Sequence, residues 1–408
     1  MPLWFVKFYV RQQLSINPGN LDAILANLQL IFDLSFRVQL PLGGRENLAT
    51  APIRLLIAAS GTGGHVFPAI ALAQQLQDYK IEWLGVPDRL ERELVPAQYP
   101  LHTIAVEGIQ QRFGLGTLRI IGRLASSVHQ VRQLLKTEKF DGVFTTGGYI
   151  AGPAIIAARW QGLPIILHES NTIPGKVTRF FSPLCSAVAL GFESTSQYLP
   201  KARTVHVGTP VRSSFRDAQK LELPIPEDVP LIVVVGGSQG AIAVNQLVRQ
   251  CAPVWLDAGA WIVHLTGEKD PDAATLKHPQ YLHMPFYDNM AGLLQRANLA
   301  ISRAGSGSLT ELAITQTPAI LIPYPYAAED HQAFNAASFA DAGAALVFRQ
   351  SELTPELLSS KVLYLLQSPQ LLQEMAQKAA ALAVTDSAER LATLVRQLLT
   401  EKGVGVGG

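Results

Sequence analysis

The sequence has little of what marks several common classes of protein. Only two cysteines, Cys185 and Cys251, occur among 408 residues, without the paired spacing of a zinc site or a disulfide framework. A formal net charge of +1 gives no global sign of a nucleic-acid partner. No apolar run approaches the roughly 20 residues of a membrane-spanning helix. These absences favour a reducing, cytosolic setting with both cysteines in the core.

The first 51 residues lack the basic, apolar and small-residue order of a secretory signal peptide, although residues 1–11 contain an apolar patch. We interpret residues 1–51 as an extension of uncertain structure ahead of the folded protein. The alternative is a weak membrane-touching segment. No side chains are assigned to a metal, and we expect neither a cofactor nor an obligatory divalent ion.

What the chain does have is 48% hydrophobic residues and enough length for two cores. From residue 53, short apolar runs alternate with segments of helical periodicity, which is typical of parallel sheets built from βαβ units. Strands are expected at residues 53–59, 81–85, 101–106, 143–145, 165–168 and 187–190, and again at 231–235, 261–265, 281–284, 299–302, 319–322 and 345–348.

This rhythm predicts an α/β fold with two Rossmann-like, doubly wound parallel-sheet domains. We expect the N-terminal domain at residues 52–212 and the C-terminal domain at residues 231–402. A proline-containing linker at residues 213–230 separates them, and residues 403–408 are expected to be a disordered tail.

A glycine-rich turn follows the first strand of each domain. Residues 55–60 lead into Gly61–His65, and residues 231–235 lead into Gly236–Gly240. Such a turn aims free backbone N–H groups and a helix N-terminus at a ligand above the sheet edge. The first turn matches neither a Walker loop nor a dinucleotide fingerprint. The pair predicts two similar domains that face each other across a cleft.

Five motifs then occur in a fixed order: Gly61–Ala69, His168–Asn171, Gly236–Ala241, Arg303–Glu311 and Asp330–Ala336. From about residue 53 to about residue 399, the ordered set closely resembles the MurG glycosyltransferases of bacterial cell-wall synthesis. The resemblance implies a GT-B architecture, with the acceptor in the N-terminal half and the donor in the C-terminal half.

The same resemblance implies an inverting transfer of N-acetylglucosamine from UDP-N-acetylglucosamine to lipid I, which gives lipid II. The acceptor group is the 4-hydroxyl of the N-acetylmuramyl sugar on undecaprenyl pyrophosphate. Its implied setting is the cytoplasmic face of the plasma membrane, with peripheral attachment. Cell-wall or division proteins are further implied partners, and nucleic acid is not.

The donor half offers a group for each part of a UDP-sugar. Ser238 and the N–H groups after Val235 suit the diphosphate without a metal. We expect Glu311 in the first turn of a helix. Its carboxylate can accept hydrogen bonds from two ribose hydroxyls, or it can simply interact favourably with the helix dipole. Ser306 lies in the same loop, and the family resemblance places the Tyr287 backbone on uracil.

Gln332 and Asn335 carry amides suited to sugar hydroxyls, and the resemblance places both on the N-acetylglucosamine ring. The alternative is that they are ordinary polar residues of an exposed helix. Arg212, at the domain junction, resembles the donor-binding arginine of the family. The alternative for Arg212 is a salt bridge within the linker.

In the acceptor half, His65 is a candidate general base, and a capping or pyrophosphate-binding role fits equally. Thr62, Gly63 and Gly64 are expected to bind substrate through backbone N–H groups. Glu169 is a second candidate base with an orienting role as the alternative. Asn171 resembles the asparagine that the family places near the donor sugar.

Residues 108–137 contain no acidic residue but carry five basic ones and an apolar stripe at helical spacing. This pattern predicts peripheral binding to an anionic membrane surface, and an ordinary helix packed on the sheet is the alternative. Three rival functions remain: another GT-B glycolipid glycosyltransferase with a diacylglycerol acceptor, a UDP-N-acetylglucosamine 2-epimerase, and an inactive nucleotide-sugar-binding protein.

Overall fold

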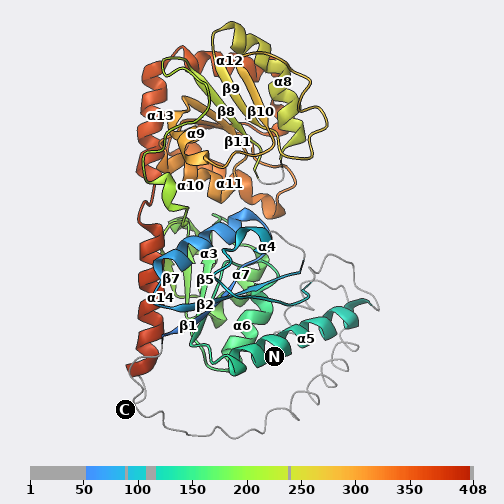
Figure 1. Cartoon of the computed structure of the whole chain (residues 1–408), viewed down its shortest axis with the longest axis vertical. Helices are drawn as coiled ribbons and strands as arrows, with labels where there is room; N and C mark the ends of the chain where they lie inside the picture. Colours follow the sequence, from blue (N-terminus) through green and yellow to red (C-terminus); the bar gives the residue numbers. More distant parts are fainter. Residues whose placement is uncertain (1–51, 88–90, 107–115, 238–239, 405–408) are drawn as a thin grey trace, which may run out of the picture. The chain divides into compact units, whose positions relative to one another are not determined.

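The computed structural model describes residues 52–87, 91–106, 116–237 and 240–404, without the side chains of residues 116–121 and 401–404. Two sheets organise this part of the chain (Figure 1). The first has seven strands in the order β3-β2-β1-β4-β5-β6-β7, and the second has six in the order β10-β9-β8-β11-β12-β13. All strand pairs within the sheets are parallel. The predicted pair of doubly wound α/β domains is confirmed.

The first domain contains the six strands expected from the sequence together with further elements. They are β1 (Arg54–Ala58), α3 (Gly63–Gln75), β2 (Lys80–Gly85), α4 (Glu91–Leu94), β3 (Leu101–Thr103), α5 (Gly116–Thr137), β4 (Gly142–Thr145), α6 (Ala151–Trp160), β5 (Ile165–Glu169), α7 (Lys176–Phe181), η1 (Ser182–Leu184), β6 (Ala187–Leu190), η2 (Glu193–Tyr198) and β7 (Thr204–His206). The edge strand β7 was not expected, because its three residues are only partly buried and form no apolar run.

The second domain and the helices after it follow the same alternation. They are η3 (Ser213–Phe215), β8 (Leu231–Val235), α8 (Ile242–Asp257), β9 (Trp261–Leu265), β10 (Tyr281–Met284), α9 (Met290–Arg296), β11 (Leu299–Ser302), α10 (Ser306–Ile314), β12 (Ala319–Leu321), η4 (Ala328–Asp330), α11 (His331–Asp341), β13 (Ala345–Val347), η5 (Gln350–Glu352), α12 (Pro355–Leu366), α13 (Pro369–Leu382) and α14 (Ser387–Val404).

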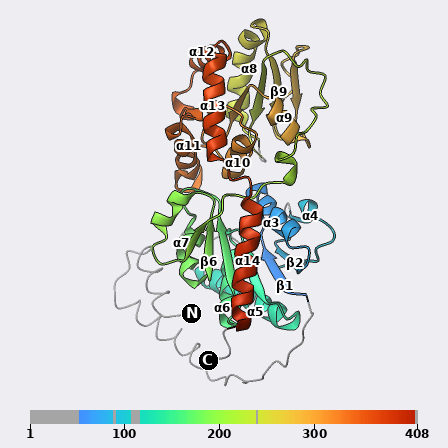
Figure 2. The ribbon, with the colours of Figure 1, turned by 90° about the vertical axis from the view of Figure 1, so that its left-hand side faces the viewer.

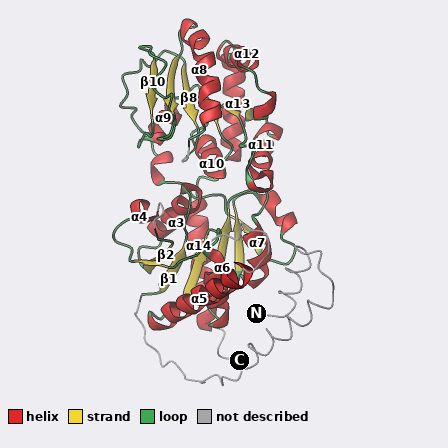
Figure 3. Ribbon diagram, turned by 90° about the vertical axis from the view of Figure 1, so that its right-hand side faces the viewer, coloured by secondary structure: helices red, strands yellow, loops and turns green. Residues whose placement is uncertain are grey.

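Helices flank both faces of the sheets, as Figure 3 shows. In β8, Val233 packs into one apolar cluster while Ile232 and Val234 pack into the other. Successive side chains of a strand point to opposite faces, so a strand covered on both sides must be apolar throughout. That requirement explains the uninterrupted run at residues 231–235.

The final helix, α14, packs against the first sheet, whereas the predicted boundaries assigned it to the second domain (Figure 2). Its buried residues Leu391, Val395 and Leu398 join the cluster that contains Leu55 and Val66. The periodicity of α14 predicted a buried face but carried no information about the partner sheet. The segment that leads back into α14 lies beside the segment that leaves the first domain. There the Ser387 hydroxyl donates to the Thr209 carbonyl at 3.2 Å.

Strand order reverses beside β1 and beside β8, since β1 lies between β2 and β4, and β8 lies between β9 and β11. In open α/β sheets, ligands bind in the crevice outside the carboxyl ends of strands at such a switch point. Both glycine turns therefore stand at the positions where this fold binds ligands. Within the described ranges, no helix is long and apolar enough to cross a bilayer.

Candidate active site

The second glycine turn links β8 to α8 and requires its glycines. Gly237 and Gly240 have φ values of +82° and +72°, which side chains rarely adopt. A Cβ on Gly236 would lie 2.7 Å from the Ala241 nitrogen, and one on Gly240 would lie 2.8 Å from the Thr266 carbonyl oxygen. The turn thus packs so closely against Ala241 and Thr266 that positions 236 and 240 leave no room for a side chain. Ser238, the predicted diphosphate ligand, lies outside the described residues.

The first glycine turn links β1 to α3 and is held from below by a residue that the sequence interpretation missed. Glu91 is fully buried and accepts hydrogen bonds from the Ser60 hydroxyl at 2.5 Å, the Val86 N–H at 2.7 Å and the Gly61 N–H at 3.3 Å. Gly85 makes room for it, since a Cβ there would lie 2.8 Å from the Glu91 Cγ. A buried carboxylate therefore lies directly under this turn.

Thr62, Gly63 and Gly64 form the start of α3, as expected. Thr62 precedes the helix in an extended conformation and makes no side-chain capping bond. The first N–H groups of a helix have no acceptor within it, so those of Gly63 and Gly64 are available to a ligand. Thr62 and Gly64 are exposed and Gly63 is buried.

His65, in the first turn of α3, is half-buried and fixed by one ring nitrogen. Its Nδ1 lies 2.7 Å from the Thr146 carbonyl oxygen. A carbonyl only accepts, so Nδ1 carries the hydrogen and the neutral ring keeps a lone pair on Nε2. Nε2 lies beside the Gly147–Gly148 turn at the end of β4. This arrangement suits a proton acceptor.

Glu169, at the end of β5, is buried and receives four hydrogen bonds. Its Oε1 accepts from the Asn171 N–H and side-chain amide, both at 3.0 Å. Its Oε2 accepts from the Gly175 N–H at 3.0 Å and the Thr178 hydroxyl at 2.6 Å. Both oxygens are engaged by the protein, which supports the orienting role over the role of general base.

Asn171 and Asn335 meet across the two domains. The Asn335 amide donates to the Asn171 Oδ1 at 3.1 Å and to the Ala304 carbonyl at 3.3 Å, and its Oδ1 accepts from the Thr172 N–H at 2.9 Å. Asn335 is fully buried. Its amide is thus occupied by the protein, and contact with a sugar requires this bridge to open.

Gln332 has a different arrangement. Its Oε1 accepts from the N–H groups of Ala304 at 3.2 Å and Tyr324 at 2.9 Å, which orients the amide nitrogen with both of its donors outward. The side chain is half-buried. Gln332 is therefore held in place and keeps donors for a ligand.

Glu311 and Arg212 form the charged part of the donor side. Glu311 is the sixth residue of α10, in its second turn, so the expectation that it lies in the first turn was wrong. Burial raises the pKa of the Glu311 carboxyl to about 7, and the Arg212 guanidinium acts in the opposite direction. Within the described part of the chain, no group donates a hydrogen bond to this carboxyl. A half-buried acceptor without a donor suits ribose hydroxyls.

Arg212 is held by stacking, not by the linker salt bridge considered above. Its guanidinium carbon lies 5.0 Å from the Phe67 ring centre and 5.2 Å from the Phe215 ring centre. Its buried Nε has no hydrogen-bond partner among the residues that the structure describes. Cation–π contacts fix the position of the charge without neutralising it.

Tyr287 and Ser306 complete the predicted set. The Tyr287 ring packs against the second domain's core, and its buried hydroxyl has no hydrogen-bond partner within the described part of the chain. Ser306 is buried at the first position of α10, where its carbonyl accepts from the Thr310 hydroxyl at 3.0 Å. Both residues lie at carboxyl ends of strands in the second sheet.

An aspartate pair with one residue between, Asp270 and Asp272, was overlooked in the sequence. Such spacing is a possible metal-ligand pattern. Here the Asp270 oxygens accept from Arg249 at 2.7 and 3.2 Å and from the Asn245 amide at 2.7 Å. In the described ranges no cluster of three or more His, Cys, Asp or Glu side chains is placed to hold a metal ion.

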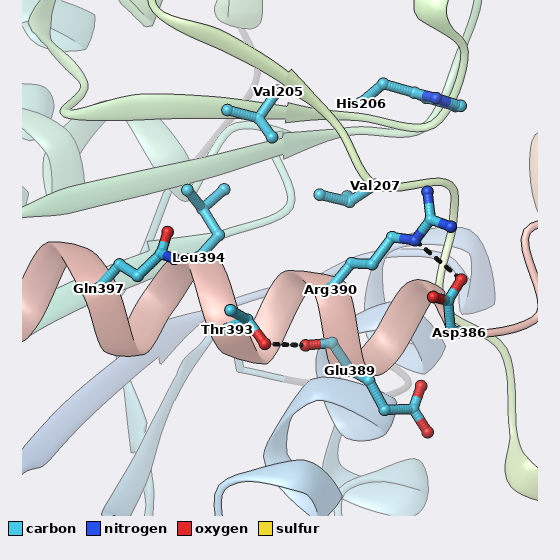
Figure 4. A pocket seen from close by; sticks show the side chains of 9 residues that line it. All are labelled: Val205, His206, Val207, Asp386, Glu389, Arg390, Thr393, Leu394 and Gln397. Atoms are coloured by element: carbon cyan, nitrogen blue, oxygen red, sulfur yellow. Dashed lines mark hydrogen bonds and ion pairs between the residues drawn. The ribbon is translucent and has the colours of Figure 1, made fainter.

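A cavity of about 380 Å³ lies between β7 and α14, away from these residues (Figure 4). Its lining contains none of the predicted site residues. The Arg390 side chain in it pairs with Asp386 at 2.8 Å. The candidate site is therefore assigned to the strand ends and not to this cavity.

Comparisons with known proteins identify the family of the chain. The N-terminal domain model of glycosyltransferase family 28 matches residues 55–190, and its C-terminal domain model matches residues 231–391. The chain is 67% identical over 355 residues to the UDP-N-acetylglucosamine--N-acetylmuramyl-(pentapeptide) pyrophosphoryl-undecaprenol N-acetylglucosamine transferase of Nostoc punctiforme, covering 86% of this chain and 99% of that protein. The protein of the same name from Gloeothece citriformis is 69% identical over 349 residues, covering 86% and 97%.

One solved structure supports the same family, and a more distant one shares only the fold. The crystal structure of Acinetobacter baumannii MurG has a TM-score of 0.68 and 31% identity, covering 85% of this chain and 100% of that one. A UDP-N-acetylglucosamine 2-epimerase from Listeria monocytogenes shares the fold at 14% identity, with a TM-score of 0.65. The chain belongs to the MurG family of glycosyltransferases.

Proposed function

We propose that this chain transfers N-acetylglucosamine from UDP-N-acetylglucosamine to the 4-hydroxyl of the N-acetylmuramyl sugar of lipid I, giving lipid II and UDP. The Nostoc punctiforme relative is named for this transfer, and the chain is 67% identical to it over nearly the whole length of that relative. The observation in this structure that supports it most is the pairing of the glycine turn after β8 with Glu311, which has no hydrogen-bond donor among the described residues.

The chemistry is a single displacement. The acceptor oxygen bonds to the anomeric carbon, the bond from that carbon to the UDP oxygen breaks, and UDP takes the electron pair. An α-linked donor then gives a β-linked product by inversion. The hydroxyl proton goes to a base, for which His65 Nε2 is the candidate, since its Nδ1 is committed to Thr146.

The leaving diphosphate gains negative charge as the bond breaks. The N-terminus of α8 and the N–H groups of the second turn would stabilise that charge, and Ser238 would add a hydroxyl donor. Glu311 would bind the ribose, Gln332 the N-acetylglucosamine ring, and Arg212 the charged part of the donor. Glu169 would orient Asn171 beside the sugar.

Lipid I is held in a membrane, so we propose peripheral attachment at its cytoplasmic face through the first domain. Val128, Val131 and Leu135 of α5 are buried against the protein, so that part of the predicted apolar stripe is not a membrane face. Arg132 and Lys136 of the same helix are exposed. Attachment would combine these charges with residues 107–115, which lie outside the described residues.

Transfer of labelled N-acetylglucosamine tests the function, with a lipid I analogue and diacylglycerol offered as competing acceptors. The expected result is a labelled lipid II product and stoichiometric UDP. Labelled diacylglycerol would instead support the other glycolipid transferase. Conversion of the UDP-sugar without any acceptor product would support an epimerase.

A further inference from the structure

A buried chain of polar groups runs below the second glycine turn and includes none of the residues assigned above. Its members are at most 8% exposed, and they come from β10, β9, α8 and the loop after β9. They are Tyr281, His264, Asn245, Asp270 and Arg249.

The first half of this chain has one consistent direction of donation. The Tyr281 hydroxyl lies 2.7 Å from His264 Nδ1, and His264 Nε2 lies 3.0 Å from the Asn245 Oδ1. Burial lowers the pKa of His264 to about 3, so the ring is neutral. An amide oxygen only accepts, so Nε2 carries the hydrogen and Nδ1 accepts from the tyrosine.

The second half ends in an ion pair. The Asn245 amide nitrogen donates to the Thr266 carbonyl at 2.8 Å and to Asp270 Oδ2 at 2.7 Å. Asp270 is held by both terminal nitrogens of Arg249. Both amide hydrogens of Asn245 and its amide oxygen are thus engaged, and a well-satisfied buried network favours a single geometry.

Asn245 connects this network to the glycine turn in two ways. Its own N–H donates to the Ala241 carbonyl at 2.8 Å, which forms the first turn of α8. The Thr266 carbonyl that it binds is the atom against which Gly240 is pressed. The side chain therefore fixes the carbonyl against which Gly240 packs, directly ahead of the N-terminus of α8, whereas the backbone bond to Ala241 would be made by any residue at this position.

We propose that Asn245 is the positioning residue of the donor diphosphate site. It contacts no substrate; it holds the turn and the N-terminus of α8 where their N–H groups can reach both phosphates. This inference rests on the proposed function, because it takes the second turn as the diphosphate site.

The test compares a ligand that has the diphosphate with one that lacks it. Titrations with UDP and with uridine are made on the whole chain and on the Asn245→Ala variant. We expect the Kd of UDP to rise about tenfold or more while that of uridine changes less than about twofold, because only the phosphate contacts are misplaced.

Asn298→Ala is the matched control. Asn298 accepts a hydrogen bond from the Leu231 N–H at 2.8 Å, at the opposite end of β8 from the turn. Its loss should lower the melting temperature without changing the ratio of the two Kd values. If Asn245→Ala does not fold, Tyr281→Phe is used instead, because it removes only the far end of the network. The ratio of the UDP Kd to the uridine Kd should then rise about threefold.

The outcomes separate the two proposals. If the unaltered chain binds uridine and UDP equally, or binds neither, the diphosphate site and this inference both fail. If it prefers UDP and the folded Asn245→Ala or Tyr281→Phe variant keeps that preference, the proposed function stands and the inference is overturned. An equal loss of both ligands also overturns it, since that is general destabilisation.

Discussion

Each of the two glycine turns joins a central strand to a helix, but different groups support them. Under the first turn lies the buried carboxylate of Glu91, which accepts the Gly61 N–H. Under the second lies the neutral amide of Asn245, whose neighbouring charges, Asp270 and Arg249, neutralise each other. Glu91 occupies one N–H donor of the first turn, whereas the Asn245 amide donates to a carbonyl and a carboxylate and, among the described residues, takes up no N–H group of the second turn. Repetition of a fold therefore does not imply repetition of a ligand.

In the proposed function the first turn serves the chemistry and the second binds the diphosphate, and each proposal can be tested separately. The largest effect should come from His65→Ala. Losing the base should lower kcat by about 10²–10⁴-fold, while the Kd of UDP should change little. Steady-state kinetics with a UDP titration measure both.

Added imidazole should restore part of the activity of this variant. The exposed His129 on α5 gives a control, since His129→Ala should keep full activity. If His65→Ala lowered UDP affinity as much as it lowered kcat, His65 would be a donor-binding residue and not the base.

At the second turn, Gly240→Ala should weaken UDP binding by about 100-fold. The new Cβ would lie 2.8 Å from the Thr266 carbonyl oxygen, and the backbone φ of +72° disfavours any side chain. Calorimetric titration with UDP checks this value.

Gly259→Ala is the matched control, because its φ is +85° but nothing lies within 4 Å of its Cβ position. It should cost stability alone. Equal UDP affinity in Gly240→Ala and Gly259→Ala would contradict the prediction that UDP binding requires the close packing of the second turn.

Ribose binding should depend on pH through Glu311. Its pKa of about 7 means that the carboxyl is mostly protonated at pH 6 and mostly ionised at pH 8. The ionised form accepts from both ribose hydroxyls, so the Kd of uridine should fall by up to about tenfold over this range. Uridine is used because it has no phosphate to titrate.

The Glu311→Gln variant should show no such dependence. The linkage also affects folding: the folded state holds this proton up to about pH 7, above the ordinary range for a glutamate. Its contribution to stability is therefore fully present in acid and is lost as the pH rises through about 7. Thermal unfolding between pH 5 and 8 should show a smaller decline for Glu311→Gln.

The support of the first turn should matter for stability and not for UDP. Glu91→Gln places an amide nitrogen among three donors, and it should lower the free energy of unfolding by about 1–3 kcal/mol. Denaturant titration measures this change. A UDP Kd altered more than about twofold would mean that the first turn also contacts the donor.

The smallest effect concerns the membrane face of the first domain. Arg132→Ala should weaken binding to vesicles of anionic lipid by about fivefold, corresponding to about 1 kcal/mol per basic residue. Sedimentation with vesicles at rising salt concentrations measures the loss. Arg296→Ala, in the second domain, is the control, and equal effects of the two would refute a face confined to the first domain.

Much of the fold was predictable because short stretches of sequence determine its strands and turns. The apolar runs at β1 and β8 and the glycines after them identify two switch-point turns without any tertiary information. The partner of α14 was not predictable, because its apolar face fits either sheet equally well. Glu91 and Asn245 were missed for a related reason: their carboxylate and amide act on residues about 30 and 21 positions away.

The site shows the same division. His65 and Glu311 could be identified by residue type and motif, but Glu169's four donors and the bridge from Asn335 to Asn171 depend on how separate segments meet. A motif predicts which residues gather at a strand end. It does not predict which of them remain free for a ligand.

The return of α14 to the first sheet has a consequence for how the molecule is made. Leu391, Val395 and Leu398 complete a core whose other residues begin at Leu55. During synthesis, that core stays uncovered until almost all of the second domain has left the ribosome, although domains usually fold in the order in which they are made. The second domain, whose two apolar clusters end at Met375 and Ala379 in sequence, can close first.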